Sequence, residues 1–215
     1  MTNLPNSLVI LGAGYQALET SEFANEDNTR TICFSTPSEF ENLAKAEPFI
    51  SYEDIELSDK KTSQAVTAVA LPKIKRDLIE SWDGKNFATI ISKCSYIASS
   101  AEIGEGVTIA PGAVISIDTK IGNHVTINLG STISHGCIVG DYSTISPGVN
   151  IAGNVDIGVG SIVGIGATIL QNIKIGKNVY VGAGSVVTTD IPDNSLAYGV
   201  PCKVYKKFAG EIIEL

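Results

Sequence analysis

The second half of the chain repeats an aliphatic residue at every sixth position. Ile or Val occupies all seventeen positions from Ile91 to Val187 in steps of six. The next residue is Gly, Ala, Ser or Thr in fifteen of these hexads, and Asn128 and Leu170 are the exceptions. Four residues after the aliphatic position stands another small or β-branched side chain, such as Cys137. This period matches neither a helix nor an alternating hairpin strand.

A six-residue period predicts short parallel strands joined by tight turns and wound into a triangular prism. In each hexad the aliphatic side chain points inward and stacks on its equivalent one coil away, and the small residue after it lets the chain turn the corner. Three hexads form one coil, so the seventeen hexads predict between five and six coils. At a strand spacing of about 4.8 Å, the prism is roughly 25 Å long. Because repeats alone specify a shape, a solenoid without chemistry remains an open alternative at this point.

The first half of the chain has a pattern typical of a small α/β unit. The apolar run Leu8–Leu11 predicts a buried parallel strand, which a glycine-bearing turn follows. The further elements predicted are a helix at 17–24, strands at 31–34 and 65–71, a helix at 76–82 and a lead-in to the prism at 87–91. The fold class is therefore α/β followed by an all-β prism.

Glycine and acidic residues place the boundary between the two halves. Residues 1–90 hold only 3 of the 21 glycines, whereas they hold 14 of the 23 acidic residues. We divide the chain into a domain at 1–88, a prism at 89–190 and a C-terminal tail at 191–215.

Composition excludes several classes of protein. Of the 215 residues, 44% are hydrophobic and 18% are charged, which fits neither a disordered chain nor a membrane protein. No apolar run approaches a membrane span and the first residues do not resemble a secretory signal, so we expect a cytoplasmic protein. The net charge of −8 disfavours nucleic-acid binding. The four cysteines form no CxxC pair, so we expect reduced thiols and no metal site.

The turn Gly12-Ala13-Gly14 resembles the start of a dinucleotide-binding motif. The match is partial, because Ala17 stands at the third glycine position and the second strand ends in Ser35-Thr36, without an acidic residue to bind the ribose of NAD. A hydride-transfer enzyme is therefore disfavoured. A nucleotide diphosphate over the turn and a turn without a ligand both stay open.

The order of the two halves resembles the hexapeptide-repeat, left-handed β-helix sugar acetyltransferases. This family includes sialic acid O-acetyltransferase-like proteins and enzymes that acetylate UDP-, dTDP- or GDP-linked amino sugars. The resemblance covers nearly the whole chain, and the segments that carry it are Gly12-Ala13-Gly14, 127–141, 152–155 and 199–203. It implies a small Rossmann-like nucleotide-sugar domain, acetyl-CoA as co-substrate, and a homotrimer with its sites between subunits.

The resemblance assigns catalytic roles to His135, Asn128 and Gly153. His135 falls on the family's general base, and an imidazole can take a proton from an amine near neutral pH. Asn128 falls on the asparagine near the acceptor amine, and Gly153 supplies a backbone N–H for the oxyanion. The other histidine, His124, is expected to be a solvated surface residue.

The binding residues follow in the same way. The resemblance places acetyl-CoA along Thr144, Gly153, Ile165, Ala183 and Lys203. It places the nucleotide sugar on Gly12, Gly14, Tyr15, Gln16, Ser35 and Thr36.

Three positions depart from the family's pattern. Gly136 stands where an acidic residue often orients the base, Thr144 where some relatives have a second histidine, and Gln16 where a histidine is common. The main expectation is N-acetylation of a nucleotide-linked amino sugar. O-acetylation of a sugar hydroxyl and a catalytically silent scaffold remain as alternatives, and replacing His135 would separate the enzymes from the scaffold.

Overall fold

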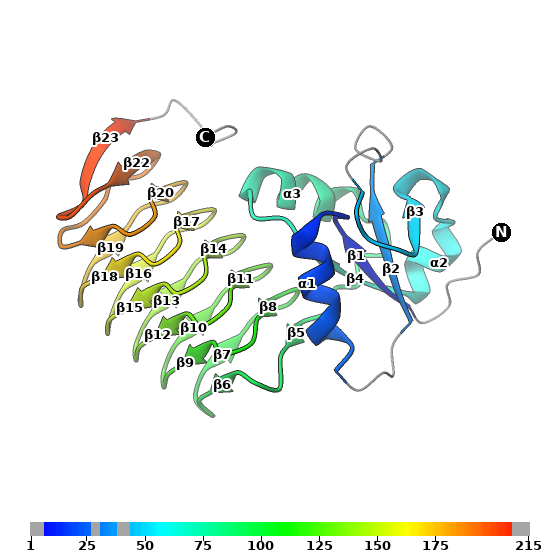
Figure 1. Ribbon diagram of the computed structural model, residues 1–215, viewed down its shortest axis with the longest axis horizontal. Helices are drawn as coiled ribbons and strands as arrows, with labels where there is room; N and C mark the ends of the chain where they lie inside the picture. The colour runs from blue at the N-terminus through cyan, green and yellow to red at the C-terminus, as the bar shows by residue number, and fades with distance from the viewer. Residues whose placement is uncertain (1–6, 27–30, 38–43, 208–215) are drawn as a thin grey trace.

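The structure is a computed structural model that describes residues 7–26, 31–37 and 44–207. It has two parts, which Figure 1 shows side by side: a small α/β unit and a long stack of short strands. Within the described residues, no helix combines the length and the apolar character that a membrane crossing requires.

The N-terminal unit is a four-stranded parallel sheet with helices packed on it. The strand order is β3-β2-β1-β4, and β1 is buried along its whole length as its apolar run predicts. The strands are β1 (Leu8–Leu11), β2 (Ile32–Thr36), β3 (Phe49–Ser51) and β4 (Gln64–Thr67). The helices are α1 (Tyr15–Ala24), the 3₁₀ turn η2 (Tyr52–Asp54), α2 (Leu57–Thr62) and α3 (Pro72–Ser81).

Several boundaries in this unit differ from the prediction. Strand β2 continues to Thr36 instead of ending at residue 34, and β4 ends at Thr67 instead of residue 71. Helix α3 starts four residues early because Pro72, whose ring fixes a helical φ, occupies its first turn. Strand β3 and helix α2 were not predicted, since both are too short to show a period.

The prism has three faces, each a parallel sheet of two-residue strands. The covered face consists of β5 (Ile90–Ile91), β8 (Thr108–Ile109), β11 (Thr126–Ile127), β14 (Thr144–Ile145), β17 (Ile162–Val163) and β20 (Tyr180–Val181), extended by β22 (Ser195–Tyr198) and β23 (Lys203–Lys207). The neutral face consists of β6 (Tyr96–Ile97), β9 (Val114–Ile115), β12 (Thr132–Ile133), β15 (Asn150–Ile151), β18 (Thr168–Ile169) and β21 (Val186–Val187). The charged face consists of β7 (Glu102–Ile103), β10 (Lys120–Ile121), β13 (Ile138–Val139), β16 (Asp156–Ile157) and β19 (Lys174–Ile175).

Every predicted hexad is a strand, and the register confirms three hexads per coil. Ile127 pairs with Ile109 on one side and Ile145 on the other, eighteen residues away each time. These side chains are fully buried in one continuous core. The first coil departs from the rule: Ile91 is 42% exposed, because no coil lies beneath it.

The corners of the prism follow a second rule that the sequence analysis missed. Three residues after each inward aliphatic from residue 103 to residue 181, the backbone has a positive φ. Eight of these fourteen positions are glycine, for which this conformation has no steric cost. The others are Asn154, Asn172, Asn178, Asp118, His124 and Tyr142.

The end of the chain completes the prism. Strands β22 (Ser195–Tyr198) and β23 (Lys203–Lys207) form an antiparallel hairpin on the covered face. The core continues beyond residue 190, because Ile191, Ala197 and Cys202 are all buried in it.

A buried lysine joins the two parts. Lys75 of α3 is completely buried, and its ammonium donates hydrogen bonds to Thr126 Oγ1 (3.0 Å), Thr144 Oγ1 (3.2 Å) and the Ser143 carbonyl (3.3 Å) on the covered face. Loss of solvation lowers its pKa to about 7. The N-terminal unit is thereby attached to the prism through polar contacts.

Candidate active site

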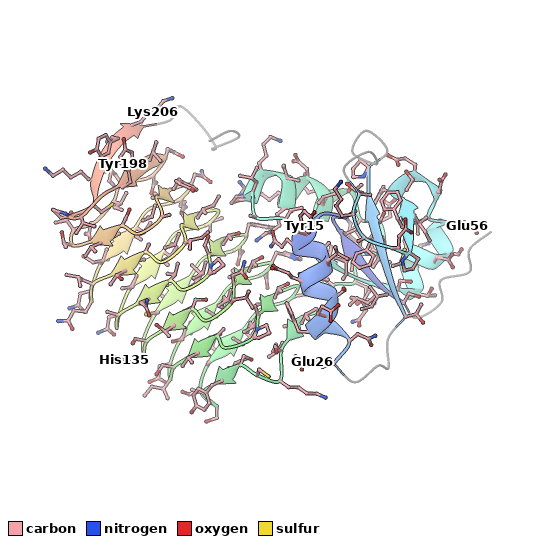
Figure 2. All side chains as sticks on the ribbon, viewed as in Figure 1. Tyr15, Glu26, Glu56, His135, Tyr198 and Lys206 are labelled. Carbon is pink, nitrogen blue, oxygen red and sulfur yellow. The ribbon has the colours of Figure 1, made fainter. Side chains whose placement is uncertain are left out.

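His135 lies on the corner between the neutral and charged faces, one coil before Gly153. Figure 2 shows it at the edge of the prism, well away from α1. Its side chain is exposed, and its carbonyl accepts a hydrogen bond from Asn154 N (2.9 Å). A Cβ at Gly153 would lie 2.6 Å from His135 Nε2. A side chain at residue 153 would therefore displace the imidazole from this position, which glycine leaves open to it.

Gly153 also offers a free donor beside that imidazole. Its carbonyl accepts from Asn172 N (3.0 Å), whereas its N–H donates to no acceptor in the part of the chain that the structure describes. A backbone N–H next to a histidine can stabilise an oxyanion formed near Nε2.

The residue after His135 lies in a backbone conformation that favours glycine over a residue with a carboxylate. Gly136 has a φ of +67°, and a Cβ there would lie 2.5 Å from Asn154 Oδ1. Over 7–26, 31–37 and 44–207, no side chain forms a hydrogen bond or ion pair with the imidazole of His135. No group of three metal-ligating side chains occurs in the same ranges.

Cys137 follows His135 closely but belongs to the core. It is completely buried, and its thiol donates to the Ala152 carbonyl (3.2 Å). Burial raises the pKa of this thiol, which opposes formation of a thiolate nucleophile. This placement agrees with the inward position that its hexad predicts.

Asn128 does not lie on the edge that carries His135. It follows β11, on the corner between the covered and neutral faces, so strand β12 separates the two residues. Its Oδ1 accepts from Leu129 N (2.9 Å). The same edge holds Ile165, which is 62% exposed, and Ala183. The predicted acetyl-CoA residues are therefore divided between two edges, with Gly153 beside His135.

Thr144 is enclosed at the domain junction. It is 2% exposed, donates to the Ala70 carbonyl (2.8 Å) and accepts from Lys75. Its side chain is closed to a ligand, and we assign it no contact with acetyl-CoA. Lys203, in contrast, is exposed at the start of β23.

The glycine-bearing turn lines a cavity of about 300 Å³ together with Thr36 and the apolar side chains of Val69 and Ile74. Gly12 N donates to the Ser35 carbonyl (2.7 Å), so this N–H is not available to a phosphate. Gly14 begins α1 with open space around it.

The other predicted nucleotide-sugar residues lie apart from this cavity. Ser35 is completely buried, so its side chain cannot reach a ligand there. Tyr15 is 74% exposed on the first turn of α1 (Figure 2). Gln16 lines a second cavity, between α1 and the covered face.

His124 is not a solvated surface residue, which corrects the expectation from the sequence. It is 7% exposed, because Phe87 packs edge-on against it (4.7 Å between ring centroids) and Tyr142 stacks on it (5.5 Å). Burial lowers its pKa. Its outward hexad position faces the N-terminal unit instead of solvent.

The sequence analysis also missed Lys75. The buried residues of α3 are Pro72, Lys75, Leu78 and Ile79. A lysine on an otherwise apolar helical stripe is the signal that could have identified a buried amine.

Comparisons with known proteins agree with this architecture. The family model described as bacterial transferase hexapeptide (six repeats) matches residues 118–153, which include Asn128, His135 and Gly153. A comparison with curated protein sequences gives no match.

Solved structures match over both parts of the chain. The acetyltransferase domain of PglB from Neisseria gonorrhoeae FA1090 is 27% identical, with a TM-score of 0.83 over 93% of this chain and 100% of that one. PerB from Caulobacter crescentus, solved with CoA and GDP-perosamine, is 26% identical, with a TM-score of 0.84 over 94% and 98%. WeeI from Acinetobacter baumannii AYE is 26% identical, with a TM-score of 0.85 over 93% and 99%.

The repeat and the order of the two parts agree with these likenesses. Over both of its parts the chain is similar to hexapeptide-repeat acetyltransferases.

Proposed function

We propose that this protein transfers the acetyl group of acetyl-CoA to the amino group of a nucleotide-linked amino sugar. The observation that carries the proposal is the His135 imidazole packed over Gly153, whose N–H donates to none of the described residues. Two relatives support the choice of substrates: one structure of the PglB domain contains acetyl coenzyme A, and PerB contains CoA and GDP-perosamine. Further PerB structures have a histidine replaced by asparagine or alanine.

In the proposed reaction His135 acts as the general base. The amine nitrogen attacks the thioester carbonyl carbon while His135 Nε2 takes the amine's proton. The new C–N bond forms, the C–S bond breaks, and the departing thiolate receives that proton to leave as CoA thiol. General-base help of this kind contributes about 10²–10⁴ in rate.

Gly153 stabilises the charge that develops on the carbonyl oxygen. Its N–H is fixed by the corner of the prism, so it needs no reorganisation during the reaction. Loss of one such donor in an oxyanion hole typically costs about 10²–10³ in rate. Direct transfer needs no thiol nucleophile, which agrees with the buried position of Cys137.

We infer a homotrimer from the three faces of the prism. The N-terminal unit packs on the covered face, and the charged face presents Glu102, Lys120, Asp156 and Lys174 outward. The neutral face presents only uncharged residues, which are Tyr96, Val114, Thr132, Asn150, Thr168 and Val186. Packing the neutral faces around a threefold axis would bring the His135 edge of each subunit toward the Asn128 edge of the next.

This arrangement would complete the acetyl-CoA and acceptor sites between subunits. His135 and Gly153 would come from one edge, and Asn128, Ile165 and Ala183 from the other, with Lys203 nearby on the hairpin. The nucleotide would occupy the cavity at Gly12, Gly14 and Thr36. We place the reaction in the cytoplasm, which agrees with four free cysteines.

Thiol release from acetyl-CoA, measured with UDP-, dTDP- and GDP-linked amino sugars, tests the proposal. We expect turnover with one of them and a loss of about 10²–10⁴ in His135→Ala, because the general base is removed. Affinity for acetyl-CoA should stay within a factor of about two, since no charge pairing is lost. Gln171→Ala is the matched control, because Gln171 occupies the same corner position two coils after His135 and is exposed.

The result of the thiol-release assay distinguishes N-acetylation from O-acetylation and from a silent scaffold. Turnover that survives in His135→Ala excludes it as the base. Release with free sugars but not with amino sugars would favour O-acetylation, and silence toward all of them would favour the scaffold. Sedimentation of the same preparations should give the mass of a trimer.

A further inference from the structure

A cavity of about 330 Å³ lies between α1 and the covered face of the prism, and we call it the α1 groove. The helix contributes Gln16, Glu19, Thr20, Glu22, Phe23 and Glu26. The prism contributes Thr108, Ala110, Pro111, Thr126, Asn128 and Leu129. The groove therefore ends at the corner where Asn128 lies, and Gln16 connects it to the glycine-bearing turn.

The helical wall of the α1 groove is acidic. Three of its residues are glutamates, and none of the described residues that line the groove is basic. Glu26 already has a structural role, because its carboxylate accepts from Ser92 Oγ (2.6 Å) and Lys93 N (2.8 Å) and attaches α1 to the first coil. Glu19 and Glu22 are exposed, and they leave two carboxylates for a ligand.

The opposite wall contains a buried hydroxyl without a partner. Thr108 is 4% exposed, and its Oγ1 forms no hydrogen bond with any described residue. Its neighbour Ile109 points into the prism core, so the Thr108 side chain points outward into the groove. A buried hydroxyl that lacks a partner costs about 1–3 kcal/mol, which a ligand in the groove would offset.

We propose that the α1 groove binds the protonated amine of the acceptor sugar and thereby selects an amino sugar over its hydroxyl counterpart. An ammonium has three donors and no acceptor, and the groove offers acceptors: the carboxylates of Glu19 and Glu22, Thr108 Oγ1 and Asn128 Oδ1. The apolar side chains of Phe23, Pro111 and Leu129 suit a deoxygenated ring carbon.

The negative charge of the groove also determines how the bound substrate is oriented. Carboxylates repel phosphates, so the diphosphate would remain at the glycine-bearing turn while the sugar extends toward Asn128. The amine is held as an ammonium on binding, releases one proton to solvent before it attacks, and gives a second proton to His135 as the new C–N bond forms. This inference rests on the proposed acetyltransferase function, because that function supplies the acceptor.

Binding of the sugar nucleotides, measured without acetyl-CoA, tests the role of the groove independently of acetyl transfer. The probes are UDP-, dTDP- and GDP-linked amino-deoxy sugars, each compared by calorimetry with the same compound carrying a hydroxyl in place of the amine. The native protein should prefer the amine, and Glu19→Gln with Glu22→Gln should weaken amine binding about tenfold at low salt, since each exposed ion pair contributes about 0.2–1 kcal/mol. Binding of the hydroxyl compounds should not weaken. Glu56→Gln, on the far side of the N-terminal unit (Figure 2), is the control.

Thr108→Val tests the opposite wall, because valine keeps the shape and removes the hydroxyl. If Thr108 serves the ligand, amine binding weakens by about three- to tenfold, as loss of one hydrogen bond predicts. If the variant only raises thermal stability and leaves binding unchanged, the groove does not use this residue.

Failure of the inference is distinct from failure of the proposed function. Equal binding of amine and hydroxyl compounds, or an amine preference that persists in the double variant, would overturn the role of the groove even if the native protein acetylates amino sugars. Amine-selective binding without thiol release would instead retain the groove and exclude the enzyme.

Discussion

The prism and the N-terminal unit differ in how their stability is distributed. In the prism each coil repeats the same inward Ile or Val, so side chains such as Ile127 and Ile145 stack in one continuous apolar core. The N-terminal unit has two smaller cores, one on each face of its sheet. It is held to the prism by the ammonium of Lys75 and by the ring of His124, and both are buried titratable groups.

The two parts of the molecule should therefore respond differently to pH. The prism fixes the edge that carries His135, and nothing in its core titrates near neutral pH. The contact that fixes the N-terminal unit on the covered face depends on groups whose pKa burial lowers. We therefore expect pH to act on the domain junction before it acts on the prism.

The largest effect is expected at Lys75. Burial lowers its pKa to about 7, against 10.5 in the unfolded chain, so the unfolded state binds more protons between these values. The free energy of unfolding of the native protein should therefore rise with pH in this window. It should rise more than the free energy of unfolding of Lys75→Met, which has no amine. From pH 7 to pH 10 the difference should grow by on the order of 4 kcal/mol, at 1.36 kcal/mol per pH unit. Urea unfolding at several pH values measures it.

The comparison with Lys75→Met removes the contribution of the other groups that titrate in this range. Arg76 is the charged neighbour that also lowers the pKa of Lys75, and it is present in both proteins. Stability curves that run parallel from pH 7 to pH 10 would show that Lys75 is solvated in solution.

Within the prism, the next largest effect separates inner coils from the first coil. Ile127→Ala should lower the free energy of unfolding by about 3 kcal/mol, because it creates a cavity in a packed core. Ile91→Ala makes the same chemical change where the side chain is 42% exposed, and it should cost less than about 1 kcal/mol. Equal losses in the two variants would mean that the first coil is covered in solution.

The prism could be predicted because one residue type recurs at one spacing. All seventeen hexads are strands, and the three-hexad coil follows from the geometry of the corner. The N-terminal unit gave weaker signals: β1 was predicted from its apolar run, whereas β3 and α2 have three and six residues and no period. Local sequence does not determine where such short segments pair.

The candidate site could be predicted only in part, for a related reason. The motif gives the proposed base, His135, and Gly153, which lie one coil apart on one edge. It does not show that Asn128 lies on another edge, or that Thr144 lies beneath Lys75, because these facts depend on which face the N-terminal unit covers. The α1 groove likewise joins Glu19 and Thr108, which are distant in sequence and meet only in the folded chain.

The smallest effect, and the most local comparison, concerns the two histidines. Burial lowers the pKa of His124 below its ordinary value of 6.5, with a smaller lowering from Lys75, while Glu105 and Asp141 act in the opposite direction. As the pH falls through 6.5, the unfolded chain binds a proton before the native protein does, so native stability is lost on the acid side.

His124→Asn removes this titration and suits the positive φ of 56° at this corner, although it loses the ring contacts with Phe87 and Tyr142. It should lower stability at pH 7 and flatten its dependence on pH between 7 and 5. His135→Asn removes an exposed histidine on another edge of the prism and is the matched control. If both variants flatten the curve equally, His124 is not specially protected, and the domain junction is no more sensitive to acid than the prism edge.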